Sequence, residues 1–168
     1  MADNDQTTPT NAGQAQGAAG QQGDFSITVN AQYVKDFSFE NPNAPKSLMN
    51  AAGGNAPDVN VNLNVEASKL NEDSYESVLK VNADAKIDGE TAFIVELSYA
   101  AIMTLKNVPD EQIQPVLMIE GPRLLFPFAR QVVADATRDG GFPPLLINPI
   151  DFVAMYQQNQ QKQAQGTA

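Results

Sequence analysis

Carboxylates are the main residues of this chain with the potential for acid–base or metal chemistry. The chain has 20 Asp and Glu against 10 Lys and Arg, with no cysteine and no histidine. This composition excludes thiol nucleophiles, disulfides, thiolate or imidazole metal sites, and the usual general base near neutral pH. A hydrolase or isomerase built on carboxylates alone would need two of them converging in a pocket with shifted pKa values. The sequence indicates only exposed ones.

One group of carboxylates, Asp84, Asp88 and Glu90, has the residue types of an acid–base pair or a Ca²⁺ site. Its spacing lacks the alternate oxygen ligands and the terminal glutamate of a calcium-binding loop. No Gly-x-x-x-x-Gly-Lys-Ser/Thr run for binding nucleotide phosphates occurs either. The solvated face of a β-hairpin is the favoured interpretation. We therefore predict no catalytic residues, no metal site and no cofactor.

The charge of the chain limits its partners. A net charge of −10 and a pI near 4.2 disfavour a nucleic acid, whose phosphate backbone is also negative, and favour a basic partner. No apolar run reaches membrane-spanning length, and the polar N-terminus lacks the apolar core of a signal peptide. We predict a cytoplasmic protein that binds no nucleic acid and does not insert into a membrane.

The segment from Leu79 to Leu97 has the pattern of a β-hairpin with Asp88-Gly89 at its turn. A three-residue loop at 87–89, with a positive φ at its glycine, makes one face apolar and places two ion pairs on the other. A two-residue loop, which pairs Ile87 with Glu90, would bring a glutamate onto the apolar face. The three-residue loop is therefore predicted. Its pairs are Lys86 with Glu90, Asp84 with Ala92, Asn82 with Ile94, and Lys80 with Glu96, the first and last being the ion pairs.

Two other stretches alternate apolar and polar residues, as strands with one buried face do. Residues 25–40 form the first, with a β-bulge expected at Val34-Lys35. Residues 58–70 form the second, after an irregular crossing segment of small residues. With the hairpin at 75–105, the chain supplies four mostly antiparallel strands. This pattern predicts an α+β fold in which one apolar face of the sheet needs a cover.

The cover is predicted to come from helices in the C-terminal part of the chain. Residues 110–119 form a short helix, Gly121-Pro122 interrupts it, and a longer helix runs to Gly140-Gly141. An extended linker at 142–147 leads to a last helix, with Asn148-Pro149 as its N-cap and first residue. We expect the apolar stripe of the longer helix in the core or at a subunit interface. That stripe is Leu125, Phe128, Ala129, Val132 and Ala136.

Both ends of the chain are poor in large apolar residues, so we predict disordered tails. The N-terminal tail spans residues 1–23. The flexible C-terminal tail spans residues 157–168, after a helical start. One domain, residues 24–156, lies between them.

Several runs in this domain resemble motifs of the SecB family of protein-export chaperones. The resemblance covers the domain in the right order and spacing. It implies a four-stranded antiparallel sheet with a crossover connection, covered on one face by two helices, and a homotetramer built as a dimer of dimers. It also implies an ATP-independent chaperone, not an enzyme, that binds unfolded secretory precursor proteins and delivers them to the SecA motor ATPase. The runs are Lys35-Asp-Phe-Ser-Phe-Glu-Asn-Pro-Asn-Ala-Pro45, Glu90-Thr-Ala-Phe93, and Leu125-Phe-Pro-Phe-Ala-Arg130 followed by Gly141-Phe-Pro143.

The resemblance also implies a docking face for SecA. Asp36, Glu40, Ile94 and Glu96 match the positions that contact SecA in this family. Asp36 and Glu40 are four positions apart on one strand and so share a face. The predicted hairpin register places Ile94 and Glu96 on the polar face as well. A merely solvated acidic face is the alternative interpretation.

Apolar residues in irregular segments are the candidates for binding unfolded clients. Such segments cannot pack fully into the sheet, and methionine adapts to varied ligands. Ordinary anchoring of loops is an equally weighted alternative. A self-assembling structural protein without client specificity is the alternative function. The candidates are Leu48, Met49, Phe142, Leu145, Leu146 and Ile147.

Overall fold

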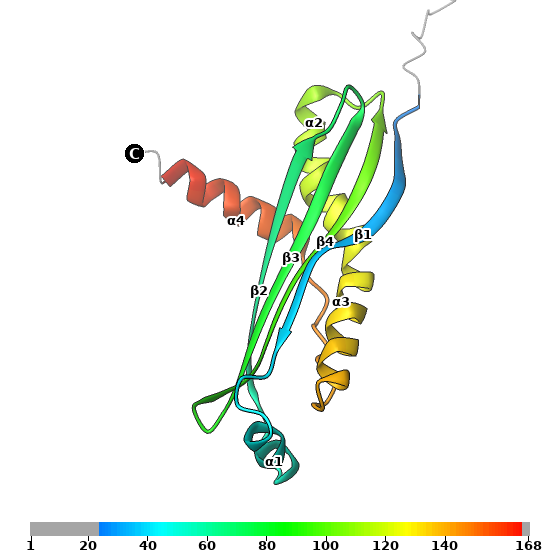
Figure 1. Cartoon of the computed structure of the whole chain (residues 1–168). Helices are drawn as coiled ribbons and strands as arrows, with labels where there is room; N and C mark the ends of the chain where they lie inside the picture. The colour runs from blue at the N-terminus through cyan, green and yellow to red at the C-terminus, as the bar shows by residue number, and fades with distance from the viewer. Residues whose placement is uncertain (1–23, 166–168) are drawn as a thin grey trace, which may run out of the picture.

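A computed structural model of the chain describes residues 24–165, so the predicted N-terminal tail and residues 166–168 lie outside the described part. One antiparallel sheet with strand order β1-β4-β3-β2 forms its body, and the long helical segment lies along one face (Figure 1). The strands are β1 Ser26–Glu40, β2 Asp58–Lys69, β3 Ser74–Ile87 and β4 Glu90–Lys106. The helices are α1 Lys46–Ala52, α2 Asp110–Pro115, η1 Val116–Glu120, α3 Gly121–Asp139 and α4 Phe152–Gln165.

The strand order confirms the predicted crossover connection. β1 pairs with β4 at one edge of the sheet, so the chain crosses to the other edge before it forms β2. Helix α1 lies in this connection, where an irregular segment was predicted. Figure 1 shows α1 at the same end of the sheet as the β3–β4 turn. Side chains in α1 and beside it contact this end of the hairpin: Lys46 contacts Glu90 at 2.8 Å, Asn43 contacts the Thr91 carbonyl at 2.9 Å, and Asn55 contacts Asp88 at 3.0 Å.

The hairpin turns through two residues. Asp88 and Gly89 have φ angles of 52° and 81°, both in the left-handed region, and Ile87 pairs with Glu90. These angles define a type I′ turn, which Asp-Gly favours because the twist of the turn matches that of the flanking strands. The predicted positive φ at Gly89 is confirmed, and the predicted three-residue loop is wrong.

A β-bulge at Ala92 explains why the predicted apolar face is nevertheless correct. Lys86 pairs with Thr91 and Ala85 with Phe93, so Ala92 is an extra residue in β4. This extra residue places Phe93, Val95 and Leu97 on the same face as the apolar residues of β3. A two-residue turn without the bulge would have placed them on the opposite face. The predicted cross-strand pairs and both ion pairs are wrong. The observed pairs are Asp84 with Ile94, Asn82 with Glu96 and Lys80 with Ser98, and the ion pairs are Lys80–Glu66 and Lys46–Glu90.

Strand β1 changes face twice. The predicted bulge is present at Lys35, and a second bulge lies at Asn30. Between the two bulges, Ala31 and Tyr33 face away from the helices, although their odd positions predicted the apolar face. The Tyr33 hydroxyl donates a hydrogen bond to Glu76 of β3 there. Alternation over the whole strand therefore misplaces its middle.

The helical segment after β4 is continuous from α2 to the end of α3. The predicted interruption at Gly121-Pro122 is absent, because the π-helical turn η1 joins α2 to α3. A π-helical turn carries the helix through Pro122, which has no N–H to donate to the preceding turn. The predicted termination is confirmed at the other end, where Gly141 has a φ of 91° just after α3.

The hydrophobic core lies between α3 and the inner face of the sheet. Leu125, Ala129 and Val133 form the buried row of α3 and are at most 1% exposed. Phe128, which belongs to the predicted stripe, is 50% exposed, and Val132 is partly buried. The buried face is thus rotated away from Phe128, which leaves that side chain on the surface of the single subunit.

Helix α4 begins later than predicted. Asp151 accepts a hydrogen bond from the Ala154 N–H at 3.0 Å and caps the helix, so the predicted start at Asn148-Pro149 is wrong. The helix continues through Gln165, into the range predicted as a tail. Figure 1 shows α4 projecting past the β2 edge of the sheet.

Candidate binding surfaces

The four residues predicted to contact SecA lie together on the outer face of the sheet, opposite the helices. Glu40 of β1 pairs directly with Ile94 of β4, and the next pair on this face is Ser38 with Glu96. Asp36 follows on the same face of β1. The corrected hairpin register does not alter this placement, because a shift by two residues leaves every side chain on its own face.

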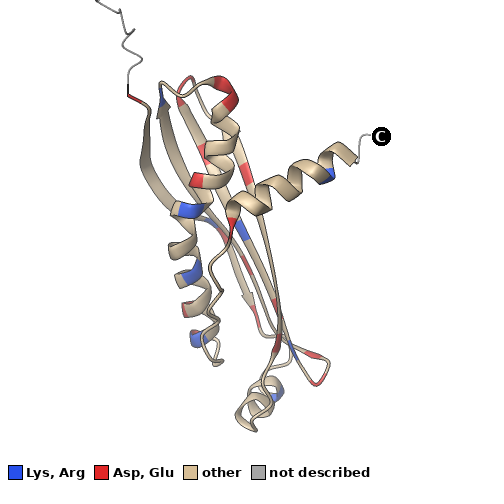
Figure 2. Ribbon diagram, turned by 180° about the vertical axis from the view of Figure 1, so that it is seen from behind, with Lys and Arg blue, Asp and Glu red and all other residues tan. Residues whose placement is uncertain are grey.

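Carboxylates surround the single aliphatic residue of this group. Ile94 is half-buried and lies between its two cross-strand partners, Glu40 on β1 and Asp84 on β3. Asp36, Glu40 and Glu96 are exposed, and none of them forms an ion pair within residues 24–165. Figure 2 shows both acidic and basic positions along the strands and along α3. The group is therefore an acidic surface with an apolar centre.

The second candidate surface is the linker at 142–147, an extended segment between α3 and α4. Phe142 and Ile147 are 4% and 6% exposed, whereas Leu146 between them is 61% exposed. The linker covers one side of an apolar pocket of about 160 Å³. The pocket is lined by Pro57, Val59, Phe93, Phe142, Pro143, Pro144, Leu145 and Leu146.

The predicted client-binding residues differ in accessibility. Phe142 and Ile147 belong to the core and anchor the two ends of the linker. Leu48 and Met49 lie in helix α1, so their predicted irregular backbone is wrong. Leu48 is half-buried and packs against Gly141: a Cβ added at this glycine would lie 2.9 Å from the Cδ2 atom of Leu48. Met49 is 71% exposed. Leu145 and Leu146 line the apolar pocket, and Leu48 and Met49 do not.

Three residues of the apolar pocket lie outside the linker and were not among the predicted site residues. Val59 belongs to the alternating row of β2, Phe93 lies on the apolar face of the hairpin, and Pro57 precedes β2. Their apolar character was visible in the sequence. Their meeting with the linker was not, because it depends on the path of the chain after α3.

The family model described as SecB, preprotein translocase subunit SecB, matches residues 20–163 of this chain. The chain belongs to the SecB family. The SecB of Xanthobacter autotrophicus, named protein-export protein SecB, is 54% identical over 140 residues, which are 83% of this chain and 88% of the relative. That of Nitrobacter winogradskyi is 55% identical over 138 residues, 82% and 86% of the two chains. That of Afipia carboxidovorans is 46% identical over 158 residues, 94% of each chain. The predicted resemblance is confirmed, and the chain is a protein-export chaperone.

A solved structure shows the same fold at low sequence identity. It is the Mycobacterium tuberculosis Rv1957 SecB-like chaperone in complex with a ChAD peptide from the Rv1956 HigA1 antitoxin. The TM-score is 0.62 at 12% identity, over 74% of this chain and 90% of that one. This likeness confirms the predicted SecB-like α+β fold.

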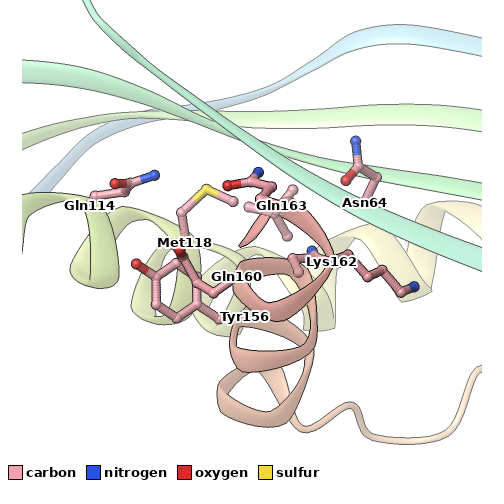
Figure 3. Close-up of a pocket in the computed structure, with 9 residues that line it drawn as sticks. Asn64, Gln114, Met118, Tyr156, Gln160, Lys162 and Gln163 are labelled. Carbon is pink, nitrogen blue, oxygen red and sulfur yellow. The ribbon is translucent and has the colours of Figure 1, made fainter. Parts of the chain in front are cut away.

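A larger pocket, of about 280 Å³, lies between α4 and the elements β2, α2 and η1 (Figure 3). Figure 3 shows Met118 of η1 close to Tyr156 and Gln163 of α4. Side-chain amides dominate the lining, and no carboxylate is among the residues that form it. The pocket was missed because α4 was predicted to lose its structure soon after Tyr156. The lining is Asn64, Val65, Gln114, Met118, Tyr156, Asn159, Gln160, Lys162 and Gln163.

Among the described residues, no carboxylate lines either the linker pocket or the pocket beside α4. The Lys35 ammonium group, 2.7 Å from the Glu76 carboxylate, and the Tyr33 hydroxyl hold the pKa of that carboxyl below its usual value. The hydrogen bond from the Tyr33 hydroxyl to Glu76 also raises the pKa of Tyr33 to about 12. These groups pair with one another on the outer face of the sheet and line neither pocket. Within residues 24–165 there is no cluster of metal-ligating side chains, and no helix has the length and apolarity to cross a membrane.

Proposed function

We propose that this chain binds unfolded precursor proteins in the cytoplasm without ATP, keeps them competent for export and delivers them to SecA. The observation that carries this proposal is the apolar pocket beneath the linker, whose lining contains no polar side chain. Unfolded chains share exposed apolar side chains but have no common sequence. A site without fixed polar groups accepts many of them, because it imposes little geometry.

Strand β2 supplies hydrogen-bonding groups beside this pocket. It is an edge strand, and in the part of the chain that the structure describes no strand pairs with its outer side. Val59 belongs both to this strand and to the pocket lining. An extended client segment can add a strand to such an edge while its apolar side chains enter the pocket. Binding of this kind uses the backbone, which every client possesses.

The acidic surface around Ile94 fits the expected contact with SecA. Its carboxylates favour a basic partner surface, and the exposed part of Ile94 offers an apolar contact at the centre. The linker pocket lies on the helix side of the sheet, so the two surfaces do not overlap. A client and SecA can therefore occupy the same subunit, as delivery of a client requires.

Exposed apolar residues on β1 and α3 support assembly as a homotetramer, a dimer of dimers. Val34 and Phe37 of β1 are 46% and 42% exposed, and Leu124 and Phe128 of α3 are 44% and 50% exposed. The ring of Phe128 stacks on Tyr99 of β4 at 6.3 Å, which extends this surface onto the sheet. Patches of this kind mark subunit contacts in soluble proteins. We expect β1 and α3 to form the interfaces.

The proposed function is tested by diluting a chemically unfolded, aggregation-prone substrate into the protein without nucleotide. The substrate should stay in solution as a complex, and ATP should change nothing. Native mass measured on the same sample should show four subunits with bound substrate. Substrate that aggregates equally fast with and without the protein would instead favour the alternative function, a self-assembling structural protein without client specificity.

A further inference from the structure

One residue of α3 holds the backbone on both sides of the Pro143-Pro144 pair. Neither proline has an N–H, so the only donors beside the pair are the amides of Phe142 and Leu145. The Phe142 N–H donates to the backbone carbonyl of Thr137 at 3.0 Å. The Leu145 N–H donates to the Thr137 side-chain oxygen, Oγ1, at 2.8 Å. Both ends of the diproline segment are thus fixed to the same residue.

Thr137 is itself held rigidly. Its side chain is fully buried, and its Oγ1 lies 3.1 Å from the Val133 carbonyl and 3.0 Å from that of Ala134. The hydroxyl proton is donated into this turn of α3, which leaves the lone pairs of Oγ1 to accept the Leu145 N–H. The linker is therefore attached to a rigid helix through one oriented hydroxyl.

The attachment determines where the accessible residues of the linker lie. Phe142 and Ile147 are fixed by burial, whereas Leu145 is only partly buried against the core and Leu146 is 61% exposed, so the bond to Thr137 adds a polar anchor between them. We propose that Thr137 is a positioning residue of the client-binding site, which holds Leu145 and Leu146 against the apolar pocket. This inference rests on the proposed function of that pocket. It adds a buried polar residue to a site that otherwise consists of apolar side chains.

The test compares Thr137→Val, which removes the hydroxyl at nearly constant shape, with Thr137→Ser, which keeps it. The probe is reduced and carbamidomethylated ribonuclease A, a permanently unfolded chain, and its affinity is measured by fluorescence anisotropy. Thr137→Val should bind the probe about fivefold to tenfold more weakly, and Thr137→Ser should bind it as the wild type does. Ser77→Ala is the matched control, because it removes another buried hydroxyl bond, to the Leu117 carbonyl, away from the linker.

Hydrogen exchange at the Leu145 amide separates this inference from the proposed function. The amide should be protected in the wild type and in Thr137→Ser, and should exchange faster in Thr137→Val. Rapid exchange in the wild type would overturn the inference even if Thr137→Val did not fold. Faster exchange with unchanged probe affinity, or an equal loss of affinity in Ser77→Ala, would overturn it as well. A wild-type protein that binds no probe while Leu145 is protected would reject the client site itself.

Discussion

The Ser77 hydroxyl of β3 donates a hydrogen bond to the backbone carbonyl of Leu117 at 3.0 Å, inside the π-helical turn η1. Because the turn is π-helical, the Gly121 N–H donates to the Val116 carbonyl. The next N–H along the helix would belong to Pro122, which has none, so the Leu117 carbonyl lacks a helical partner. Ser77 therefore supplies the missing donor from the sheet. The contact is close: a Cβ at Gly121 would lie 2.4 Å from the serine oxygen.

Replacement of Ser77 by alanine should lower the free energy of unfolding by about 1–3 kcal/mol, because it leaves a buried carbonyl without a partner. Gly121→Ala should also destabilise the fold, since the added methyl group overlaps the Ser77 side chain. Urea unfolding measures both effects. The control is Ser38→Ala, at a half-buried serine of β1 whose side chain forms no hydrogen bond among the described residues. Equal stability of Ser77→Ala and Ser38→Ala would show that the helix does not need this bond.

The wrongly predicted break between α2 and α3 illustrates what a local pattern cannot predict. Gly121-Pro122 carries the usual signals of a break, yet the helix continues there, and its Leu117 carbonyl accepts a hydrogen bond from Ser77, which is distant in the sequence. The hairpin shows a related limit. Alternation predicted which residues of β3 and β4 face the core, but a shift by two residues preserves every face, so alternation could not determine the register.

The candidate site was predictable only in part. Apolar side chains at 142–147 were evident, but no periodic pattern shows which of them point inward when two prolines interrupt the segment. Phe142 and Ile147 turn inward and Leu146 outward because α3 fixes the backbone between them. The acidic face was easier to predict, because Asp36 to Glu40 and Ile94 to Glu96 each lie within an unbroken stretch of one strand.

The contacts of Glu76 with Lys35 and Tyr33 predict a loss of stability at both extremes of pH. The pKa of Glu76 is lowered in the folded state from 4.5, so its stabilising effect is present above that value and is lost as acid protonates the folded carboxyl. The pKa of Tyr33 is raised from 10.0 to about 12, so its contribution is complete below pH 10 and is lost as the pH rises toward 12. Glu76→Gln should reduce both changes in urea unfolding measured against pH. The control, Glu66→Gln, matches the change in net charge at an exposed pair with Lys80. If the pH profile of Glu76→Gln matches that of the wild type, the contacts of Glu76 do not contribute.

Leu146→Ser should weaken client binding without unfolding the protein. The side chain is 61% exposed, so its loss should change the free energy of unfolding by no more than about 0.5 kcal/mol. Covering this side chain with a client should stabilise the complex by about 1–2 kcal/mol, which Leu146→Ser would lose. Adding Leu145→Ser should enlarge the effect. Binding is measured with an unfolded probe, and stability by the melting temperature.

Two matched variants complete this experiment. Leu70→Ser removes a leucine that is 50% exposed in the β2–β3 turn, outside the pocket lining, and should leave client affinity unchanged. Phe142→Ala removes a buried anchor and should lower the free energy of unfolding by about 3–5 kcal/mol. Should Leu146→Ser and Leu70→Ser weaken client binding equally, the loss would reflect general surface apolarity, and the linker pocket would not be the binding site.

Charge reversal on the outer face should abolish SecA binding while leaving client binding intact. Asp36→Lys with Glu96→Lys replaces two exposed carboxylates beside Ile94, neither of which forms an ion pair within residues 24–165. The fold should therefore lose little stability, and the native mass should remain that of a tetramer. The wild-type complex with SecA should weaken as salt rises, because screening reduces the attraction between an acidic surface and a basic partner.

The control for charge reversal is Glu111→Lys, which changes an exposed carboxylate of α2. Ile94→Ala on the outer face tests the apolar centre separately: it should weaken SecA binding without changing its dependence on salt, since no charge is removed. Titration calorimetry with SecA at low and high salt measures each variant. SecA affinity that survives the double reversal at low salt, or that falls equally in Glu111→Lys, would place the docking surface away from Ile94.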